Sequence, residues 1–446
     1  MHTRKHPVWL LTLTALAALT LPGVVWAQQS TTGPVPPPGL DLGRRASSPG
    51  DSVIPGVPAY LWHHGCCPTA LGMVIGYWDG LGYPDLVRGP AQMQTAYVDS
   101  MIADDSGLPN CDLTHQDHYQ DYSCPIDSVG PILADQSQPG GSPHPNDCVA
   151  DFMRTSWSFL SNRYGFSWLT DVPIAFTAYS NFAASYTPTT ATYAFPAFPW
   201  WYYKCEIDLG RPMVLEVDAN GDGDANHCVT AVGYNDSTGE YGCYDTWERD
   251  VGWHPWVPMA PGTQWGVANI VTFAYGQVEC CPDPALCTVD PCDSYNGIIT
   301  SPTPSPGDEF EFAVTVVCAS GLPAVNMNVD VYLGDPENHY VCDPATFHGT
   351  TDALGVVTFN LSAGGCTIGQ NAVWIDAGVV TMRTYQNIRS PDWAPLSDGD
   401  VDLSDFIFFG GYYGLPGGGC VDYDDNGEVM LLDFSRFARA WGRRCR

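Results

Sequence analysis

Two adjacent cysteines, Cys66 and Cys67, stand where a helix is expected to begin. Pro68 follows them, and proline is tolerated in the first helical turn because its missing N–H is not needed there. Apolar residues at helical spacing then form one face: Leu71, Val74, Ile75 and Trp78. The start of a helix carries a positive partial charge and free N–H groups, which favour a thiolate and can hold an oxyanion beside it. The chemistry predicted for Cys66 is therefore nucleophilic attack on a carbonyl carbon.

A cysteine nucleophile needs a base and a group that orients that base. His227 opens the strand-like run HCVTAVGYND (227–236), and Asp245 lies in YGCYDTW (241–247), one short turn later. Two neighbouring antiparallel strands would bring Asp245 within hydrogen-bonding distance of His227 and fix the tautomer of its ring. His63 and His64 lie in the loop before the helix, where they are expected only to line the cleft.

Three segments resemble papain-like cysteine peptidases of the bacteriocin-processing (double-glycine peptidase) type. They are GCCPTALGMVIGYWD (65–79), NHCVTAVGYND (226–236) and YDTW (244–247). The resemblance covers about residues 57–276. It implies an α+β papain-like domain that acts on a peptide or protein substrate. It also implies a triad with Cys66 as nucleophile, His227 as base and Asp245 as the orienting residue.

Two positions depart from that family. Cys67 stands where the family usually has glycine or serine, so it is a bystander, a bridge partner or a redox lock on Cys66. The glutamine that usually completes the oxyanion hole is missing, because the chain reads YLWHHG before Cys66. His63 or His64 would have to replace it, or Trp62 marks a branch that works without it. An inactive peptidase-like binding or structural module of the cell envelope is therefore the alternative function.

Composition predicts a secreted or cell-surface protein. Arg4 and Lys5 precede an apolar run that ends at Val25-Trp26-Ala27, as in a signal peptide over residues 1–27. The remaining chain has no segment with the length and apolarity of a membrane span. A formal net charge of −32 argues against a nucleic-acid partner. The 17 cysteines of a secreted chain predict disulfide bonds.

The order of sequence patterns predicts a multidomain chain. A Pro/Gly/Ser-rich linker over 28–56 precedes the peptidase-like unit over 57–279, whose helix-first, strands-last order is typical of an α+β domain. A Cys/Pro-rich connector over 280–306 has cysteine spacing that favours a disulfide knot over a zinc site. Alternating apolar residues then predict an immunoglobulin-like β-sandwich over 307–391.

The last segment, residues 392–446, contains two copies of a Gly/Asp-rich loop followed by an apolar helix. The second copy has oxygen-bearing residues at positions 1, 3, 5, 7 and 12 of a calcium loop, the one at position 7 acting through its main chain. These residues are Asp422, Asp424, Asn426, Glu428 and Asp433. The first copy offers Asp398, Asp400, Asp402 and Asp405. Ala394 and Leu396 fall at its positions 1 and 3, so we expect one strong and one impaired site.

This double loop–helix resembles a type I dockerin, a small all-α calcium-binding domain. The resemblance implies calcium as cofactor and a cohesin-type scaffold or surface partner. Cys420 and Cys445 flank the second copy and are expected to form a bridge. Another acidic loop, DANGDGDANH (218–227), runs into His227 and is either an exposed hairpin or a partial calcium site. The predicted function is a secreted cysteine peptidase attached to a scaffold through this calcium-dependent tail.

Overall fold

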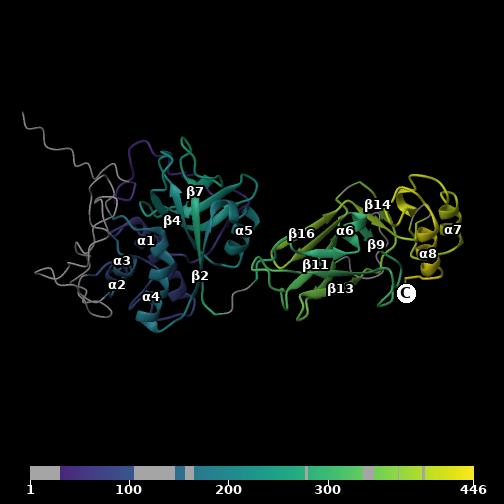
Figure 1. The fold of residues 1–446 in the computed structure, drawn as a ribbon, viewed down its shortest axis with the longest axis horizontal. Coiled ribbons are helices and arrows are strands. Elements are labelled where there is room, and N and C mark those ends of the chain that lie inside the picture. Colours follow the sequence, from purple (N-terminus) through teal and green to yellow (C-terminus); the bar gives the residue numbers. More distant parts are fainter. Residues whose placement is uncertain are drawn as a thin grey trace, which may run out of the picture.

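The computed structural model describes residues 31–104, 146–155, 165–276, 280–334, 346–369, 371–393 and 397–445. The predicted signal peptide and the tail positions Ala394 and Leu396 lie outside this part of the chain. Figure 1 shows an α/β unit in purple and teal, followed along the long axis by a β-rich unit in green and two helices in yellow. No helix in the described ranges has both the length and the apolarity needed to cross a membrane.

The first unit is built on an antiparallel sheet with the strand order β2-β7-β3-β4-β5-β6, and β1 pairs with β4. The strands are β1 (Asp51–Val53), β2 (Thr189–Ala194), β3 (Met213–Asp218), β4 (His227–Asn235), β5 (Glu240–Tyr244), β6 (Gly252–Pro255) and β7 (Gly266–Ala274). The helices are α1 (Cys66–Gly80), α2 (Ala96–Ile102), α3 (Val149–Met153), α4 (Val172–Ala184) and α5 (Trp200–Asp208). In Figure 1, α1 to α4 lie on one side of this sheet and α5 on the other.

Helix α1 is the central helix of this unit. The sequence predicted one apolar face, but almost every residue of the helix is buried. Glycine allows this close packing, because a Cβ added at Gly72 would lie 2.8 Å from Cγ1 of Ile102 on α2. On another face, the Thr230 hydroxyl of β4 donates to the carbonyl of Ala70 at 2.9 Å. Helix α1 is thereby held directly against β4, the strand that begins with His227.

The segment predicted as a linker is packed against the first unit from residue 31 onward. Its composition indicated a free tether, but specific side chains anchor it. Arg45 forms ion pairs with Asp51 at 2.8 Å and with Glu240 at 3.2 Å. The indole of Trp265 donates to the carbonyl of Asp41 at 2.6 Å. This segment therefore forms part of the wall of the first unit.

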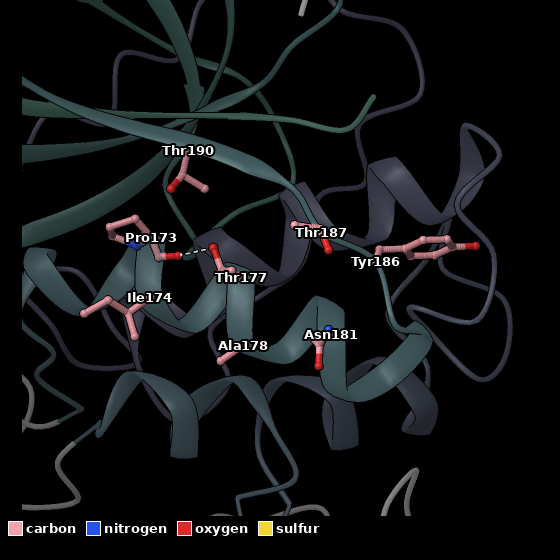
Figure 2. A pocket seen from close by; sticks show the side chains of 8 residues that line it. All are labelled: Pro173, Ile174, Thr177, Ala178, Asn181, Tyr186, Thr187 and Thr190. Carbon is pink, nitrogen blue, oxygen red and sulfur yellow. Dashed lines mark hydrogen bonds between the residues drawn. The ribbon is translucent and has the colours of Figure 1, made fainter. Parts of the chain in front are cut away.

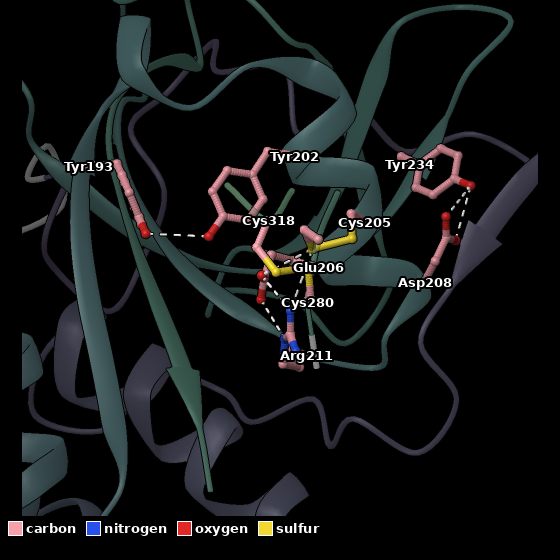
Figure 3. The surroundings of a disulfide bond; sticks show 10 residues. Tyr193, Tyr202, Cys205, Glu206, Asp208, Arg211, Tyr234, Cys280 and Cys318 are labelled. Atoms are coloured by element: carbon pink, nitrogen blue, oxygen red, sulfur yellow. Dashed lines mark hydrogen bonds and ion pairs between the residues drawn. A yellow bond between two sulfur atoms is a disulfide. The ribbon is translucent and has the colours of Figure 1, made fainter. Parts of the chain in front are cut away.

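Disulfide bonds join the connector to both neighbouring units. Cys281 is bonded to Cys205 of α5, and Cys280 is bonded to Cys318. A buried ion pair between Glu206 and Arg211 lies beside these bridges, with atoms 2.6 Å apart (Figure 3). The predicted cysteine knot is only partly present, since the two later connector cysteines, Cys287 and Cys292, are free and buried.

The described residues of the second unit form three sheets, with the orders β13-β10-β8, β12-β11-β15-β16 and β14-β17-β9. Their bounds are β8 (Thr288–Asp290), β9 (Gly297–Ile299), β10 (Glu311–Thr315), β11 (Asn328–Leu333), β12 (Thr346–Thr350), β13 (Val356–Asn360), β14 (Cys366–Thr367), β15 (Val373–Ala377), β16 (Val380–Tyr385) and β17 (Asn387–Arg389). A short helix, α6 (Cys292–Tyr295), precedes β9. The first two sheets share one hydrophobic core. Because β8 belongs to the predicted connector, this core begins earlier in the chain than expected.

The tail consists of helices α7 (Leu403–Gly410) and α8 (Leu431–Ala440), each preceded by an acidic loop. Its core is continuous with the second unit, because Ile299 and Phe310 pack with Phe409 and Phe437. The expected Cys420–Cys445 bridge is wrong, since Cys420 is bonded to Cys366 of β14. The sequence could not reveal this pairing, because cysteine spacing alone does not determine connectivity.

Candidate active site

Cys66 lies at the first position of α1, where the sequence predicted it. The thiol is free, and only 1% of the residue is exposed. Gly65 precedes it in an extended conformation, and the loop before it is held by Thr69, whose hydroxyl accepts from the N–H of His63 at 2.9 Å. The local sequence therefore places one sulfur at a helix N-terminus inside the unit.

Cys67 is a bridge partner, which is one of the three roles that the sequence left open for it. It is bonded to Cys228 on β4, with the two Cα atoms 4.9 Å apart. The sulfur atoms of Cys66, Cys67 and Cys228 all lie within 4.8 Å of one another. The bridge connects the residue after Cys66 to the residue after His227, so it ties the start of α1 to the start of β4.

Burial decides the charge of Cys66 in this structure. Desolvation raises the pKa of the thiol to about 11, while the backbone N–H groups of Cys228, Cys67 and Cys66 partly lower it and the charge of Glu216 raises it further. The sequence predicted a stabilised thiolate. A helix terminus contributes only about 0.3–1 kcal/mol, whereas complete burial shifts a pKa by several units. Cys66 is consequently a neutral thiol at pH 7.

His227 is held in the tautomer that a general base requires. Its Nε2 atom lies 2.9 Å from the main-chain carbonyl oxygen of Asp245. A carbonyl only accepts, so Nε2 carries the proton and Nδ1 keeps its lone pair. Nδ1 is buried and has no hydrogen-bond partner among the described residues. Burial lowers the pKa of His227 to about 4, and the backbones of Asp245 and Thr31 partly offset this effect.

The structure corrects the role predicted for the Asp245 side chain. Its carboxylate makes no hydrogen bond with His227, but forms an ion pair with Arg44 and accepts from the N–H groups of Trp247 at 2.9 Å and Glu248 at 3.0 Å. Asp245 lies just beyond the end of β5, where the chain turns and directs the carboxylate toward these donors. The residue orients His227 through its carbonyl group instead.

Two tryptophans that the sequence did not assign to the site are part of it. The Trp247 ring stacks on His227, with ring centroids 4.1 Å apart and an interplanar angle of 8°. Its indole N–H donates to the carbonyl of Gly33 at 2.8 Å, and the indole of Trp62 donates to the carbonyl of Thr32 at 2.8 Å. The run DTW after β5 could have identified Trp247 from the sequence. The segment that Trp247 binds gave no such signal, because it was predicted to be a tether.

The acidic loop between β3 and β4 is closed by its own hydrogen bonds. The carboxylate of Asp218 accepts from the N–H groups of Gly221 and Gly223, both at 2.7 Å. The side-chain amide of Asn226 donates to Asn220 Oδ1 at 2.7 Å. These bonds shape the hairpin that leads into His227, and calcium binding in this loop stays a prediction.

The second tail loop gathers carboxylates. One oxygen from each of Asp422, Asp424 and Asp433 lies within 4.8 Å of the others. Asp422 accepts from the N–H of Gly427 at 2.9 Å, and Asp433 accepts from the N–H of Tyr423 at 2.7 Å. The loop therefore concentrates negative charge around one point.

The first tail loop contains a residue that the sequence analysis missed. Asp392 accepts from the N–H of Gly399 at 2.9 Å, as Asp422 does from Gly427. Asp405 in turn accepts from the N–H of Trp393 at 2.8 Å. The first loop has two more residues before its glycine than the second loop. Alignment of the two copies at a constant spacing therefore missed Asp392. The expectation that this copy lacks an acid at its first position is therefore wrong.

A groove elsewhere on the first unit is not part of this site. It has a volume of about 590 Å³ and runs along α4 and β2 (Figure 2). It is lined by Pro173, Ile174, Thr177, Ala178, Asn181, Tyr186, Thr187 and Thr190. None of Cys66, His227 and Asp245 belongs to its lining.

Comparison with known proteins supports the peptidase resemblance. Residues 54–260 match the Peptidase_C39 like family, and this range contains Cys66, His227 and Asp245. The crystal structure of xylellain, a cysteine protease from Xylella fastidiosa, is similar over 52% of this chain and 88% of that chain, at 13% sequence identity and a TM-score of 0.27. No curated protein matches the chain.

Proposed function

We propose that the first unit is a cysteine peptidase that hydrolyses peptide bonds with Cys66 as nucleophile and His227 as base. Two observations carry the proposal. A disulfide joins the residues that directly follow Cys66 and His227, and the His227 tautomer leaves Nδ1 with a lone pair. A free thiol at a helix start and a buried base are thus kept on neighbouring elements.

The proposed reaction begins when the sulfur of Cys66 attacks the carbonyl carbon of a peptide bond. The thiol proton passes to Nδ1 of His227, and the main-chain N–H groups at the start of α1 hold the developing oxyanion. Collapse of the tetrahedral intermediate releases the amine, which takes the proton from Nδ1. Water, deprotonated by His227, then hydrolyses the thioester and restores the Cys66 thiol.

The resting pair is neutral. Burial keeps Cys66 protonated and His227 unprotonated at pH 7, and the two side chains share no hydrogen bond in this structure. Catalytic hydrogen bonds often form only in the substrate complex. We therefore expect substrate binding to bring the sulfur and Nδ1 into contact.

A peptide-library digestion tests this function. The full chain, Cys66→Ala and His227→Ala are compared for cleavage, and we expect each substitution to reduce kcat/KM by at least about 10³-fold. Cleavage that persists in Cys66→Ala would overturn the peptidase assignment. A correctly folded wild-type chain that cleaves nothing, but still binds peptides, would favour the alternative of an inactive binding or structural module.

We also infer that the tail binds calcium, which prefers six to eight oxygen ligands. The clustered carboxylates of the second loop fit such a cation. The proposed second-loop ligands are Asp422, Asp424, Asn426, Asp433 and the main chain of Glu428. The first loop would use Asp392, Asp398, Asp405 and the main chain of Asp400. The carboxylate of Asp402 accepts from the N–H of Ser404 at 2.8 Å and so caps α7.

The proposed role of the tail is docking to a cohesin-type scaffold or surface partner. Exposed apolar residues on and beside α7 and α8 support it, since exposed apolar surface can mark an interaction site. These residues include Leu403, Phe406, Ile407, Leu431, Leu432, Phe434 and Trp441. Calorimetry of the full chain with a cohesin module, with calcium and with a chelator, tests this role. Binding that ignores the chelator would contradict calcium-dependent docking.

Secretion is part of the same proposal. The apolar N-terminal run predicts a signal peptide, and disulfides such as Cys67–Cys228 and Cys366–Cys420 are typical of oxidising compartments. Fractionation of producing cells followed by mass determination of the N-terminus tests it. A chain that stays in a reducing compartment with its first residues intact would contradict secretion.

A further inference from the structure

The first sheet places a carboxylate close to the candidate nucleophile. Glu216 of β3 is paired in register with Cys228 of β4. Residues directly opposite each other on neighbouring strands point to the same face of a sheet, with Cβ atoms about 4.5–5.5 Å apart. The sulfur atoms of Cys228 and Cys66 in turn lie within 4.8 Å of each other. Glu216 therefore lies close to the sulfur that the proposed reaction uses.

Contacts of β4 show which way the Glu216 side chain points. Cys228 is bonded to Cys67 of α1, and the Thr230 hydroxyl donates to the carbonyl of Ala70 in the same helix. Side chains alternate between the two faces along a strand, so Cys228 and Thr230 share the face that carries α1. Glu216 shares that face as well. The carboxylate is therefore on the side of the sheet where α1 begins.

A neutral neighbour holds this carboxylate in place. The side-chain amide of Asn269 on β7 donates to Oε2 of Glu216 at 2.7 Å. Burial raises the pKa of Glu216 and this hydrogen bond partly lowers it, and among the described residues no Lys or Arg contributes. Glu216 and Asn269 are both half-buried, whereas Cys66 is only 1% exposed. The chain thus fixes a negative charge near Cys66 without supplying a positive partner.

For the nucleophile alone, this charge is unfavourable. Burial is the main cause of the raised pKa of Cys66, and the charge of Glu216 raises it further. A positive group beside a carboxylate would offset this effect, because opposite charges a few ångströms apart stabilise each other. A substrate that brings such a group would therefore favour the thiolate at the moment when its carbonyl carbon arrives.

We propose that Glu216, held by Asn269, selects peptide substrates that carry a lysine or arginine side chain near the scissile bond. The proposal rests on the proposed function for Cys66 as the nucleophile. Glu216 forms the ion pair with the substrate, and Asn269 positions the carboxylate. The formal net charge of −32 would attract basic peptides from solution in the same way.

The first test labels Cys66 in the full chain with three methanethiosulfonates at pH 7. The aminoethyl reagent is cationic, the methyl reagent is neutral and the sulfonatoethyl reagent is anionic. In each case the thiolate sulfur forms a disulfide with the reagent and methanesulfinate leaves. Peptide mapping gives the rate at Cys66, which is divided by the rate of the same reagent with free cysteine. We expect the cationic reagent to react at least about tenfold faster than the anionic one. Equal normalised rates, or no labelling by the cationic reagent, would overturn the proposal.

Substitutions separate Glu216 from the general charge of the chain. Glu216→Gln keeps an oxygen that can accept from Asn269 but removes the charge. The ratio of cationic to anionic rates should fall by at least about tenfold, and the neutral reagent should react faster because the pKa of Cys66 is lower. Glu216→Asp keeps the charge and should keep most of the ratio. An unchanged ratio in Glu216→Gln would overturn the proposal.

The matched control is Glu311→Gln in the second unit. Glu311 also accepts from an asparagine amide, that of Asn360 at 3.1 Å. It contributes the same formal charge to the chain as Glu216, but lies on β10 and outside the first sheet. Labelling in Glu311→Gln should match the wild type. A fall in the ratio as large as that in Glu216→Gln would contradict a local role for Glu216.

The second test measures cleavage of paired peptide libraries in which each position in turn carries lysine or uncharged norleucine. We expect the wild type to prefer lysine at one position by at least about tenfold in kcat/KM, and Glu216→Gln to lose this preference. Equal cleavage of both libraries by the wild type would overturn only the specificity. A wild-type chain that cleaves neither library, but shows the labelling that depends on Glu216, would overturn only the peptidase assignment.

Discussion

Cys67 and Cys228 are joined by a disulfide, and they are the residues that directly follow Cys66 and His227 in the chain. The bridge spans a sequence separation of 161 residues. It connects the N-terminus of α1 with the second residue of β4. The second of the adjacent cysteines therefore positions the first one relative to the base.

Removal of this bridge is expected to weaken both the fold and the site. Cys67→Ser combined with Cys228→Ser should lower the free energy of unfolding by about 2–5 kcal/mol, because the unfolded chain regains the entropy of a long loop. Peptide cleavage should fall as well. Chemical denaturation and cleavage assays measure the two effects.

The matched control removes Cys280–Cys318, which lies outside the first sheet and has a sequence separation of 38. Cys280→Ser with Cys318→Ser should destabilise the chain but leave kcat/KM unchanged. Equal losses of activity in both double variants would show that the Cys67–Cys228 bridge has no special role in the site.

The Asp245 carboxylate is expected to matter less for catalysis than its carbonyl. Asp245→Asn keeps the hydrogen bond between the main-chain carbonyl and Nε2 of His227. We expect kcat to fall by no more than about tenfold, against at least about 10³-fold for His227→Ala. Steady-state kinetics at pH 7 checks this. Comparable losses in the two variants would restore the carboxylate as the orienting group.

The stability of the chain should depend on pH through His227. Its pKa in the folded chain is about 4, below the ordinary value of 6.5, so between these values the unfolded chain binds a proton that the folded chain does not. His227 therefore lowers stability as the pH falls from about 6.5 to about 4. The neighbouring His254, with a pKa lowered to about 3, acts in the same direction.

The contribution of His227 is measured by comparison with His227→Gln. The variant should lose less stability across that pH range than the wild type, by an amount on the order of 2–3 kcal/mol. Urea denaturation at several pH values gives the two curves. Parallel curves would contradict a buried neutral His227, and His254→Gln shows how much of the remaining slope belongs to the second histidine.

Each tail loop is expected to bind one calcium ion. Asp392→Ala and Asp422→Ala should each lower the calcium stoichiometry of the full chain by one, because each removes the acid that also binds the loop glycine. Calorimetry with calcium measures the number of sites. Asp352→Ala, in a turn of the second unit, serves as the control. An unchanged stoichiometry in Asp392→Ala would restore the view that the first loop is impaired.

Local spacing predicted the elements that present the site. Helix α1 begins at Cys66 and strand β4 begins at His227, because the apolar periods and Pro68 are visible within a few residues. The contacts between distant parts were not predictable in the same way. Arg44 lies 201 residues from Asp245, in a segment whose composition indicated a tether. The spacing of the repeat likewise hid Asp392, because the first loop is two residues longer.

The charge of Cys66 shows a second limit of sequence analysis. The sequence showed a helix N-terminus at Cys66. The N–H groups there lower the pKa of the thiol, which is the predicted direction. The depth of burial was not visible, because it depends on how distant residues such as Cys228 and Glu216 lie around the sulfur in the folded chain. Desolvation is the larger effect in this structure, so the thiol is neutral.

Cys66 is tested most directly as the nucleophile by acid quenching of the chain during turnover of an activated peptide ester, followed by peptide mapping. We expect an acyl group on Cys66 and on no other residue, with no adduct in Cys66→Ala. We also expect His227→Ala to form this adduct far more slowly. Turnover with the acyl group on another residue, or undiminished turnover in Cys66→Ala, would contradict Cys66 as the nucleophile.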